Sequence, residues 1–540
     1  MVPGRAARPY RPVMSDTPSP HDTYTSPLAA RNASPEMLKL WSPRHKFNTW
    51  RRIWLAVAEA QHEVTKDRDG GPLVTKTQVE ALRTVVERGI TDAELARAAE
   101  LERDLRHDVM AHVHCLGESC PEAKAIIHLG CTSQDVVCNA DLLTVFEACR
   151  LSCAKLAAVV LEVAQRAGDN VGMPTLGFTH YQAAQPTTVG RRLAGYAYEL
   201  SLVLERLDDL RTCELAARGL RGATGTQASF LNLLGDDHDA VSRLEAEVLL
   251  NKEVFDELGS GIKIVDWHPA DPSGNMGSFE MTPKSFTLTG QTYPRVIDTF
   301  VLADLASIAA VLHKIATDIR LLSNRKEIDE PFGSKQIGSS AMPYKRNPMK
   351  CERICGLARF VMNLVGNAYD TAATQWLERT LDDSSNRRLS LPEAFLALDG
   401  ALDLMHQVAS GLVVHEAMVR RNLMAELPFL ATEHILMEAV KAGGDRQEYH
   451  EIIRAHAQEA GMRVKSEGLD NDLLDRLQAD PAFHPPALTR ELDWSGLMDP
   501  MRYVGRSVEQ TERFLSEVIE PLRERYADEL AELGGSDRGV

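Results

Sequence analysis

Apolar residues recur along much of the chain with the spacing of an α-helix that is buried on one face. Between residues 301 and 322, the steps from one apolar position to the next alternate between four and three residues. This spacing forms a heptad stripe, in which apolar side chains line one side of a helix. The stripe consists of Val301, Leu305, Ile308, Leu312, Ile315, Ile319 and Leu322. Charged residues on the other faces indicate a helix that packs in a protein bundle and not in lipid.

Two more segments predict long helices of the same bundle. A second amphipathic stripe is formed by Leu156, Val159, Val160 and Val163, and residues 196–215 give a third helical candidate. Clean alternation of apolar and polar residues, which would indicate β-strands, is scarce throughout. We therefore predict an all-α fold with a central bundle of long helices, flanked by two smaller, mostly helical regions.

Segments rich in Pro, Gly, Ser and Thr interrupt the helical pattern. The longest is residues 257–285, which we interpret as an irregular insertion in the bundle, and a shorter one lies near residues 66–75. We divide the chain into a basic leader (1–23), an N-terminal helical domain (24–132), the central bundle (133–413) and a C-terminal helical domain (414–540).

Composition and charge narrow the range of partners. The 540 residues carry a net charge of −17, which argues against nucleic acid because phosphate binding needs a basic surface. A small anionic ligand in a locally cationic pocket is still compatible with this charge. No run of about 18 consecutive apolar residues occurs, so we expect no membrane span.

The spacing of the cysteines and the composition of the N-terminus indicate the cellular compartment of the protein. Nine cysteines are scattered without a CxxC pair, which favours a reduced intracellular protein. The first 14 residues hold three arginines and no acidic residue, a composition faintly similar to an organelle transit peptide. We prefer a disordered leader, or a start at Met14, and expect a cytoplasmic protein.

Two histidine-containing stretches are candidates for chemistry. In residues 106–114 three histidines follow the pattern HxxxxHxH, which differs from the zinc motif HExxH, so we expect no metal and place Arg106, His107 and Asp108 near a pocket. In residues 176–188, His180 lies between a glycine and a proline. A histidine titrates near neutral pH and can deliver a proton, although His180 alone could equally be an ordinary hydrogen-bonded residue.

Two further stretches gather cations and small polar residues. The loop "GSSAMPYKRNP", residues 338–348, precedes a helical segment. We expect the start of that helix, with Lys345 and Asn347, to attract anions, because free N–H groups and the helix dipole favour negative charge there. Arg353 follows within two turns, and residues 378–388, "ERTLDDSSNRR", bring more arginines. The small polar stretch at residues 224–230, "TGTQASF", allows close backbone approach.

In combination these stretches resemble one enzyme family. The loop matches the GSSxMPxKxNP motif of the fumarase/aspartase superfamily. Further stretches, in the same order along the chain, resemble adenylosuccinate lyases of the animal type. They are "SPLAARNASPEM", "RHDVMAHVH", "IIHLGCTSQD", "PTLGFTHYQAAQ", "TGTQASF", "ERTLDDSSNRR" and "ELPFLATEHILM". The resemblance extends from residue 24 to about residue 525.

The resemblance implies a fold, an assembly and a reaction. Subunits of this family are all-α in three regions, and four of them form a homotetramer with a twenty-helix core and active sites shared between three subunits. The implied reaction is the β-elimination of fumarate from a nucleotide substrate without any cofactor. Adenylosuccinate gives AMP, and the succinyl-carboxamide ribotide SAICAR gives AICAR.

The resemblance also assigns roles to residues. Ser339 would be the base, His180 the general acid and His107 a residue that orients the acid or touches the substrate. Lys345 and Asn347 would hold the succinyl carboxylate. The remaining substrate-binding positions are Arg31, Asn32, Arg106, Asp108, Thr132, Ser133, Gln227, Arg353, Arg379, Ser384 and Arg388. Free serine is a poor base, so Ser339 needs a neighbourhood that stabilises its alkoxide, for which Lys345 and the helix start are candidates.

Departures from the family pattern and two alternatives stay open at this point. Asn32 stands where the family has tyrosine, and Ala183 stands where it has proline. An argininosuccinate lyase-like enzyme shares the loop, although the stretches at residues 224–230 and 378–388 weigh against it. A non-catalytic helical scaffold is the second alternative. A nucleotide kinase is excluded because the chain has no GxxxxGK[ST] loop.

Overall fold

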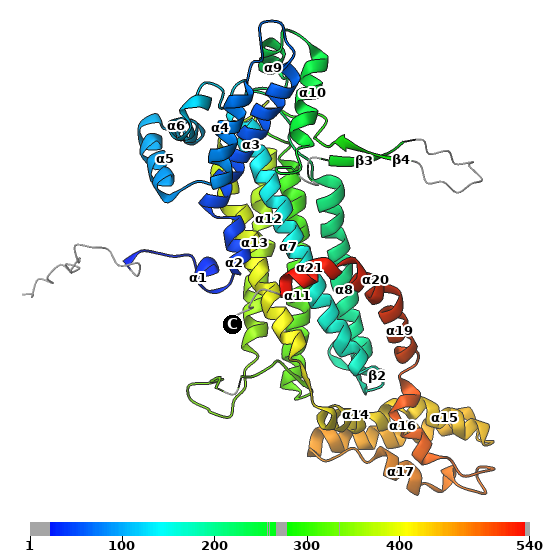
Figure 1. The fold of residues 1–540 in the computed structure, drawn as a ribbon. Helices are drawn as coiled ribbons and strands as arrows, with labels where there is room; N and C mark the ends of the chain where they lie inside the picture. The colour runs from blue at the N-terminus through cyan, green and yellow to red at the C-terminus, as the bar shows by residue number, and fades with distance from the viewer. Residues whose placement is uncertain (1–21, 256–257, 259, 266–277, 334, 535–540) are drawn as a thin grey trace, which may run out of the picture.

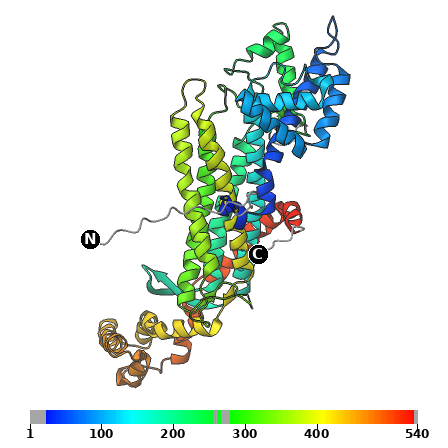
Figure 2. The ribbon, with the colours of Figure 1, turned by 90° about the vertical axis from the view of Figure 1, so that its left-hand side faces the viewer.

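A computed structural model describes residues 22–255, 258, 260–265, 278–333 and 335–534. The leader that we predicted falls almost wholly outside these residues. The described chain is mostly helical, and a bundle of long, nearly parallel helices runs through its middle (Figures 1 and 2). This arrangement confirms the all-α prediction.

The N-terminal region consists of short and medium helices. They are α1 (Pro27–Arg31), α2 (Pro35–Leu40), α3 (Pro43–Thr65), α4 (Lys76–Arg88), α5 (Asp92–Leu105) and α6 (Asp108–Ser119). In this region, α1 and α2 lie along the side of the bundle and α3 to α6 gather at one end of it (Figure 1). Local sequence sets several of their starts. Thr75 and Thr91 each form a capping box, with Gln78 and Glu94 three residues later, and this satisfies N–H groups that the first turn leaves free.

The bundle is built from five long helices. They are α7 (Ser133–Asp169), α8 (Val189–Asp209), α11 (Val296–Asn324), α12 (Met349–Ala373) and α13 (Asp382–Ser410), with the shorter α9 (Ala228–Leu233) and α10 (His238–Leu249) near one end. All seven residues of the predicted heptad stripe are buried on α11, and the second predicted stripe is buried on α7. The third predicted helix corresponds to α8 and the π-helical turn Leu210–Glu214 that follows it.

The C-terminal region forms a second, smaller core beyond the other end of the bundle (Figure 1). Its helices are α14 (Glu416–Leu430), α15 (Thr432–Lys441), α16 (Arg446–Met462), α17 (Leu473–Ala479) and α18 (Trp494–Leu497). The chain then returns through α19 (Ser507–Phe514), α20 (Glu520–Arg525) and α21 (Ala527–Gly534). We assigned these last three helices to the C-terminal domain, but they contact α7 and α8, and residues 507–534 add Ile519, Leu522 and Tyr526 to the core of the bundle.

Short irregular helices complete the helical part of the structure. They are Pro121–Ala123, Arg463–Glu467, Pro481–Phe483, Pro500–Tyr503 and Leu515–Ile519.

Three small antiparallel strand pairs accompany the helices. They are β1 (Pro174–Thr179) with β2 (Gln182–Thr188), β3 (Ser260–Val265) with β4 (Ser278–Pro283), and β5 (Ile328–Asp329) with β6 (Val413–Val414). The insertion at residues 257–285 is therefore not wholly irregular as expected, because its described part is a hairpin in register from Ser260–Pro283 to Val265–Ser278. The alternation of Ile262, Lys263 and Ile264 is the strand signal that the surrounding glycines and prolines obscured.

One described helix, α11, is long and apolar enough to cross a membrane by length and composition alone. Its apolar stripe is buried within the protein, against α12, α13 and α8. We therefore interpret α11 as a core helix of the bundle.

Candidate active site

One group of predicted residues gathers where α7 begins, and we call it the α7-end cluster. It comprises His107, Asp108, Thr132, Ser133 and Arg388. His107 caps α6 by accepting the N–H of Met110 on Nδ1 at 3.3 Å, so the neutral imidazole carries its proton on Nε2. That Nε2 lies 3.5 Å from the Ser133 hydroxyl, and Arg388 donates to Asp108 at 2.9 Å.

The α7-end cluster borders a cavity of about 310 Å³ that we call the α7-end cavity. Predicted residues Arg379, Ser384 and Arg388 line it together with Lys46, a cation that the sequence analysis did not identify. Burial lowers the pKa of Lys46. Burial acts to raise the pKa of Asp108, but the hydrogen bond from the Val109 N–H and the charge of Arg388 outweigh it and lower that pKa. The cavity therefore presents several cations and suits an anionic ligand.

A network of buried ion pairs forms one wall of this cavity. Arg387 donates to Asp298 at 2.6 Å and to Asp141 at 2.9 Å, and Arg295 donates to Asp383 at 2.8 Å. Both arginines are buried, so Arg387 is a structural residue and not part of a free cationic surface. Such pairs fix the end of α13 that carries Ser384 and Arg388, because separating buried charges is costly.

A buried aspartate joins the start of α7 to the loop that carries Gln227. Asp135 accepts the N–H of Thr132 at 2.7 Å, Arg221 at 2.8 Å and Gly222 at 3.0 Å. Gln227 itself has positive φ and donates to the carbonyl of Leu220 at 2.9 Å, so its amide is engaged within the loop. Arg106 is exposed in a left-handed conformation between α5 and α6.

A second group, the Arg31 cluster, lies beside the first turns of α12 and comprises Arg31, Asn32 and Arg353. Arg353 donates to the carbonyl of Arg31 at 2.9 Å and to Asn32 Oδ1 at 3.3 Å. The three residues line a cavity of about 520 Å³ together with Lys350. Asn32 thus provides an amide oxygen for Arg353.

The segment that carries Arg31 and Asn32 packs against α13. Asp399, which is fully buried, accepts the N–H of Ser34 at 2.6 Å and pairs with Lys155 at 2.6 Å. A Cβ built on Gly400 would lie 2.6 Å from the carbonyl oxygen of Asn32. Only glycine permits this approach, so the segment rests directly on the α13 backbone.

The loop that precedes α12 carries Ser339, Lys345 and Asn347. Ser339 Oγ accepts two backbone N–H groups, from Met342 at 3.1 Å and from Ala341 at 3.3 Å. Asn347 donates to the carbonyl of Gly338 at 2.8 Å and closes the loop on itself. Lys345 is exposed. Two N–H donors aimed at one oxygen stabilise negative charge there, so this geometry favours the alkoxide of Ser339.

The start of α12 corrects one expectation. We predicted that its free N–H groups attract an anionic ligand, but a buried side chain of the protein already occupies them. Glu330 accepts the N–H of Lys350 at 3.0 Å and of Cys351 at 2.9 Å. Sequence reasoning missed this cap because Glu330 lies 20 residues before the helix that it caps. The same carboxylate fixes both ends of the Ser339 loop.

His180 lies at the tip of the β1–β2 hairpin. His180 and Tyr181 form its two-residue turn, and both have the positive φ values that a type I′ turn requires. The strands pair up to Thr179 with Gln182, and Ala183 pairs with Phe178. The imidazole is exposed. Arg325, just after α11, stacks on Phe178 at 4.7 Å and attaches the hairpin to the bundle.

The long helices separate these groups. The 37 residues of α7 span about 55 Å between the α7-end cluster and the β1–β2 hairpin. The 25 residues of α12 span about 37 Å between the Ser339 loop and the segment of Arg379. In Figure 1 helices α3 to α6 lie at one end of the bundle, and the hairpin and the Ser339 loop lie at the other. Within one chain, therefore, neither His180 nor Ser339 reaches the α7-end cavity.

Two protein-family models match the chain. The model described as adenylosuccinate lyase C-terminus matches residues 428–514, and the model described as lyase matches residues 29–232 and 281–363. The adenylosuccinate lyase of Saccharomyces cerevisiae is 44% identical over 95% of this chain and 99% of its own length. The adenylosuccinate lyase of Schistosoma mansoni is 41% identical over 94% of this chain and 98% of its own length.

Solved structures show the same fold at lower identity. A fumarate lyase from Mesorhizobium sp. BNC1 superposes with a TM-score of 0.70 at 20% identity, covering 90% of this chain and 98% of its own. The 3-carboxy-cis,cis-muconate lactonizing enzyme from Pseudomonas putida gives 0.70 at 25% identity, covering 92% and 99%.

The close packing of the Arg31 cluster against Gly400 gives a testable prediction. Gly400→Ala places a Cβ against the Asn32 carbonyl, and such overpacking costs about 1–3 kcal/mol. We expect amide hydrogen exchange across residues 27–34 to accelerate by about tenfold or more, since each 1.4 kcal/mol corresponds to a factor of ten. Gly366→Ala on α12 is the matched control because nothing lies within 4 Å of its added Cβ. Unchanged exchange in Gly400→Ala would contradict this assignment.

Proposed function

The chain belongs to the adenylosuccinate lyase family of the fumarase/aspartase superfamily, and we propose that the residue clusters described above carry out the reaction of this family. It is a carbon–nitrogen lyase that releases fumarate from adenylosuccinate. The match to the adenylosuccinate lyase C-terminal model sets aside the argininosuccinate lyase-like alternative. We extend the proposal to SAICAR as a second substrate and to a cytoplasmic location.

The first chemical step is the removal of a proton from the carbon beside a succinyl carboxylate. We assign this step to Ser339, whose oxygen accepts N–H groups from Ala341 and Met342. These donors lower the cost of forming the alkoxide, which answers the objection that free serine is a weak base. Lys345 provides a positive charge on the same loop. We assign Lys345 and Asn347 to binding the carboxylate that gains charge during the reaction.

The second step breaks the C–N bond and forms the double bond of fumarate. The leaving nitrogen of the nucleotide must gain a proton, and His180 is the assigned donor. Its exposed position on the hairpin turn suits a group that acts on a substrate held elsewhere. His107, which presents its Nε2 proton towards Ser133, is assigned to orient the substrate or the acid.

We assign the binding of the nucleotide to the cationic residues. Arg379, Ser384 and Arg388 line the α7-end cavity, and Arg31 and Arg353 lie in the second cluster. Arginine suits these positions because its guanidinium binds phosphate or carboxylate in a bidentate manner. Thr132, Ser133 and Gln227 complete the set at the start of α7. Lys46 is an addition to the residues that the family motifs indicate.

A complete site requires several copies of the chain under this assignment. The observation that carries the proposal is the separation of Ser339 from the α7-end cluster by the length of α12. The bundle helices α8, α11 and α12 also leave large apolar side chains exposed, namely Leu202, Phe300, Phe360 and Tyr369. We propose a homotetramer in which these faces are covered and each site combines the α7-end cluster, the hairpin and the Ser339 loop from different subunits.

The role of Ser339 is tested by substitution. Ser339→Ala should reduce fumarate formation from adenylosuccinate by at least about 100-fold, since a positioned base contributes 10²–10⁴-fold. Its melting temperature should match that of the unmodified protein because the side chain lies on a loop. Ser340→Ala is the control for a nearby hydroxyl without an assigned role. Full activity in Ser339→Ala would refute the assignment, and an inactive unmodified protein would favour the non-catalytic scaffold.

The sharing of sites is tested by mixing two inactive variants. Ser339→Ala and His107→Ala affect opposite ends of the bundle, so mixed oligomers should contain some sites with both groups intact. We expect substantial fumarate formation after the two proteins are unfolded and refolded together, and none after each is treated alone.

The matched control mixes Ser339→Ala with Lys345→Ala. Both residues lie on one loop of one chain, so no arrangement of subunits restores an intact loop, and we expect no recovery. Equal recovery in both mixtures, or none in either, would contradict the shared site.

A further inference from the structure

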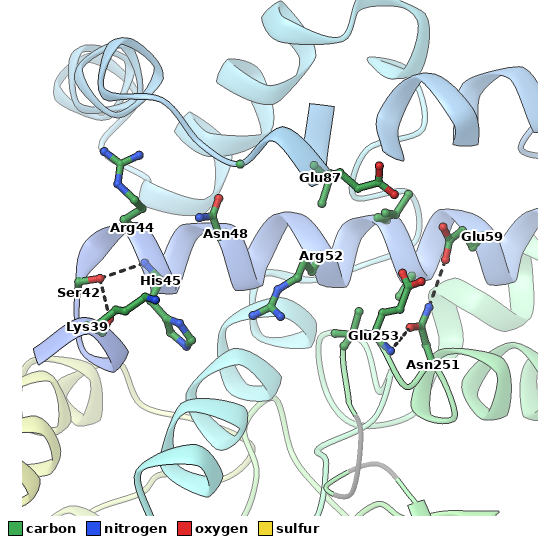
Figure 3. Close-up of a pocket in the computed structure, with 15 residues that line it drawn as sticks. Lys39, Ser42, Arg44, His45, Asn48, Arg52, Glu59, Glu87, Asn251 and Glu253 are labelled. Carbon is green, nitrogen blue, oxygen red and sulfur yellow. Dashed lines mark hydrogen bonds between the residues drawn. The ribbon is translucent and has the colours of Figure 1, made fainter. Parts of the chain in front are cut away.

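Another cavity lies on the face of α3 opposite Lys46 and Phe47, and we call it the α3 cavity. Figure 3 shows the residues that line it. It measures about 380 Å³, and small-molecule pockets span about 300–1,000 Å³. Its walls come from the end of α2, from α3, from the end of α4 and from residues 251–254. Among the described residues, none lines both cavities.

One half of the α3 cavity is cationic. Lys39, Arg44, His45 and Arg52 line it, and Figure 3 shows Arg52 midway along α3. Arg44 is paired with Asp92. Within the described part of the chain, neither Lys39 nor Arg52 has a carboxylate oxygen within 4.0 Å, and the Arg52 guanidinium donates to the Thr49 hydroxyl at 3.0 Å. These two cations are therefore available to an anion.

His45 lies in the cationic half, and its pKa reflects its burial and the positive charges around it. Burial, with the positive charges of Arg52 and Lys39, lowers the pKa of His45 to about 4. His45 is thus neutral at physiological pH in an environment that disfavours a further positive charge. Its Nε2 lies 3.5 Å from Glu147, which lines a neighbouring cavity and has a pKa raised by burial.

The other half of the α3 cavity is acidic. Glu59, Glu87 and Glu253 line it, and all three pair with the single guanidinium of Arg83, at 3.2 Å for Glu253 and 3.5 Å for Glu87. Because three carboxylates share one guanidinium, this half has more hydrogen-bond acceptors than donors. Asn251 donates to Glu59 at 3.2 Å and completes this end. The acidic half therefore suits a ligand group that donates hydrogen bonds.

The distance between the cationic and the acidic half limits the length of the ligand and the groups at its two ends. Arg52 and Glu59 are seven residues apart on one face of α3, which separates their positions by about 10 Å along the axis. Leu55, Ala56 and Val254 line the cavity together with them. A fitting ligand has an anionic group at one end, a body with apolar faces and an amino group at the other.

We propose that the α3 cavity binds a nucleoside monophosphate whose base carries an amino group, with the phosphate at Lys39 and Arg52 and the amino group at Glu59. AMP is the natural candidate, a choice that rests on the proposed function because AMP is the product of that reaction. The cavity would then hold a second AMP per chain, outside the active site.

Such binding has a physical route to the active site through α3. The opposite face of α3 carries Lys46 and Phe47, which line the α7-end cavity. The Phe47 ring stacks on His112 of α6 at 3.7 Å, and α6 begins directly after His107. A ligand that shifts α3 therefore displaces groups around the substrate, and we expect AMP to slow turnover in a manner that excess substrate does not fully reverse.

The experiment measures AMP binding to the full chain by isothermal titration calorimetry. We expect two AMP molecules per chain in the unmodified protein. In Arg52→Glu and Lys39→Glu, we expect the second site to weaken by at least tenfold while fumarate formation without AMP is unchanged. Arg243→Glu is the matched control, because this exposed arginine of α10 lines neither cavity. Adenosine should leave the second site empty, and inorganic phosphate should compete with AMP there.

Two results would overturn the proposal. One is a single AMP per chain in the unmodified protein, and the other is a second site that both charge reversals leave intact. Fumarate formation without AMP is measured separately, so a failure of the proposed function is distinguished from a failure of the second site.

Discussion

The rigidity of the long helices is the constraint on which the rest of the structure depends. An α-helix advances 1.5 Å per residue, so groups at the two ends of α7 or α12 are held apart by about 55 Å or about 37 Å. No rotation of side chains closes such a distance. A bundle of this kind presents the candidate catalytic groups at both ends, and under our proposal a functional site forms where an end of one bundle meets another part of a second copy.

Buried carboxylates hold the functional segments in place on this frame. Asp135 receives backbone N–H groups from the start of α7 and from the turn at residues 221–222, Asp399 receives one from the Arg31 segment, and Glu330 receives two from the start of α12. All three are buried. An unpaired charge in such a position costs several kcal/mol, so each contact keeps its segment in one geometry. The reacting side chains can then be exposed without losing their orientation.

The sequence predicted the helical parts well, since a buried helix face leaves a regular spacing. The seven apolar positions of α11 are an example. It did not predict the β1–β2 hairpin, whose turn at His180 depends on backbone angles that neither residue type reveals. The candidate reactive residues were selected because their motifs resemble a family, and their roles stay predictions. Lys46 and Glu330 were missed, because each acts through residues distant in the sequence and no local pattern marks it.

Specific activity as a function of protein concentration, with the oligomeric state recorded by mass photometry in the same samples, tests the shared site most directly. We expect fumarate formation per chain to fall in step with the fraction of tetramer upon dilution, until monomers show none. Monomers that retain the full activity per chain would contradict the account, since one chain would then bring Ser339 and the α7-end cluster together by itself.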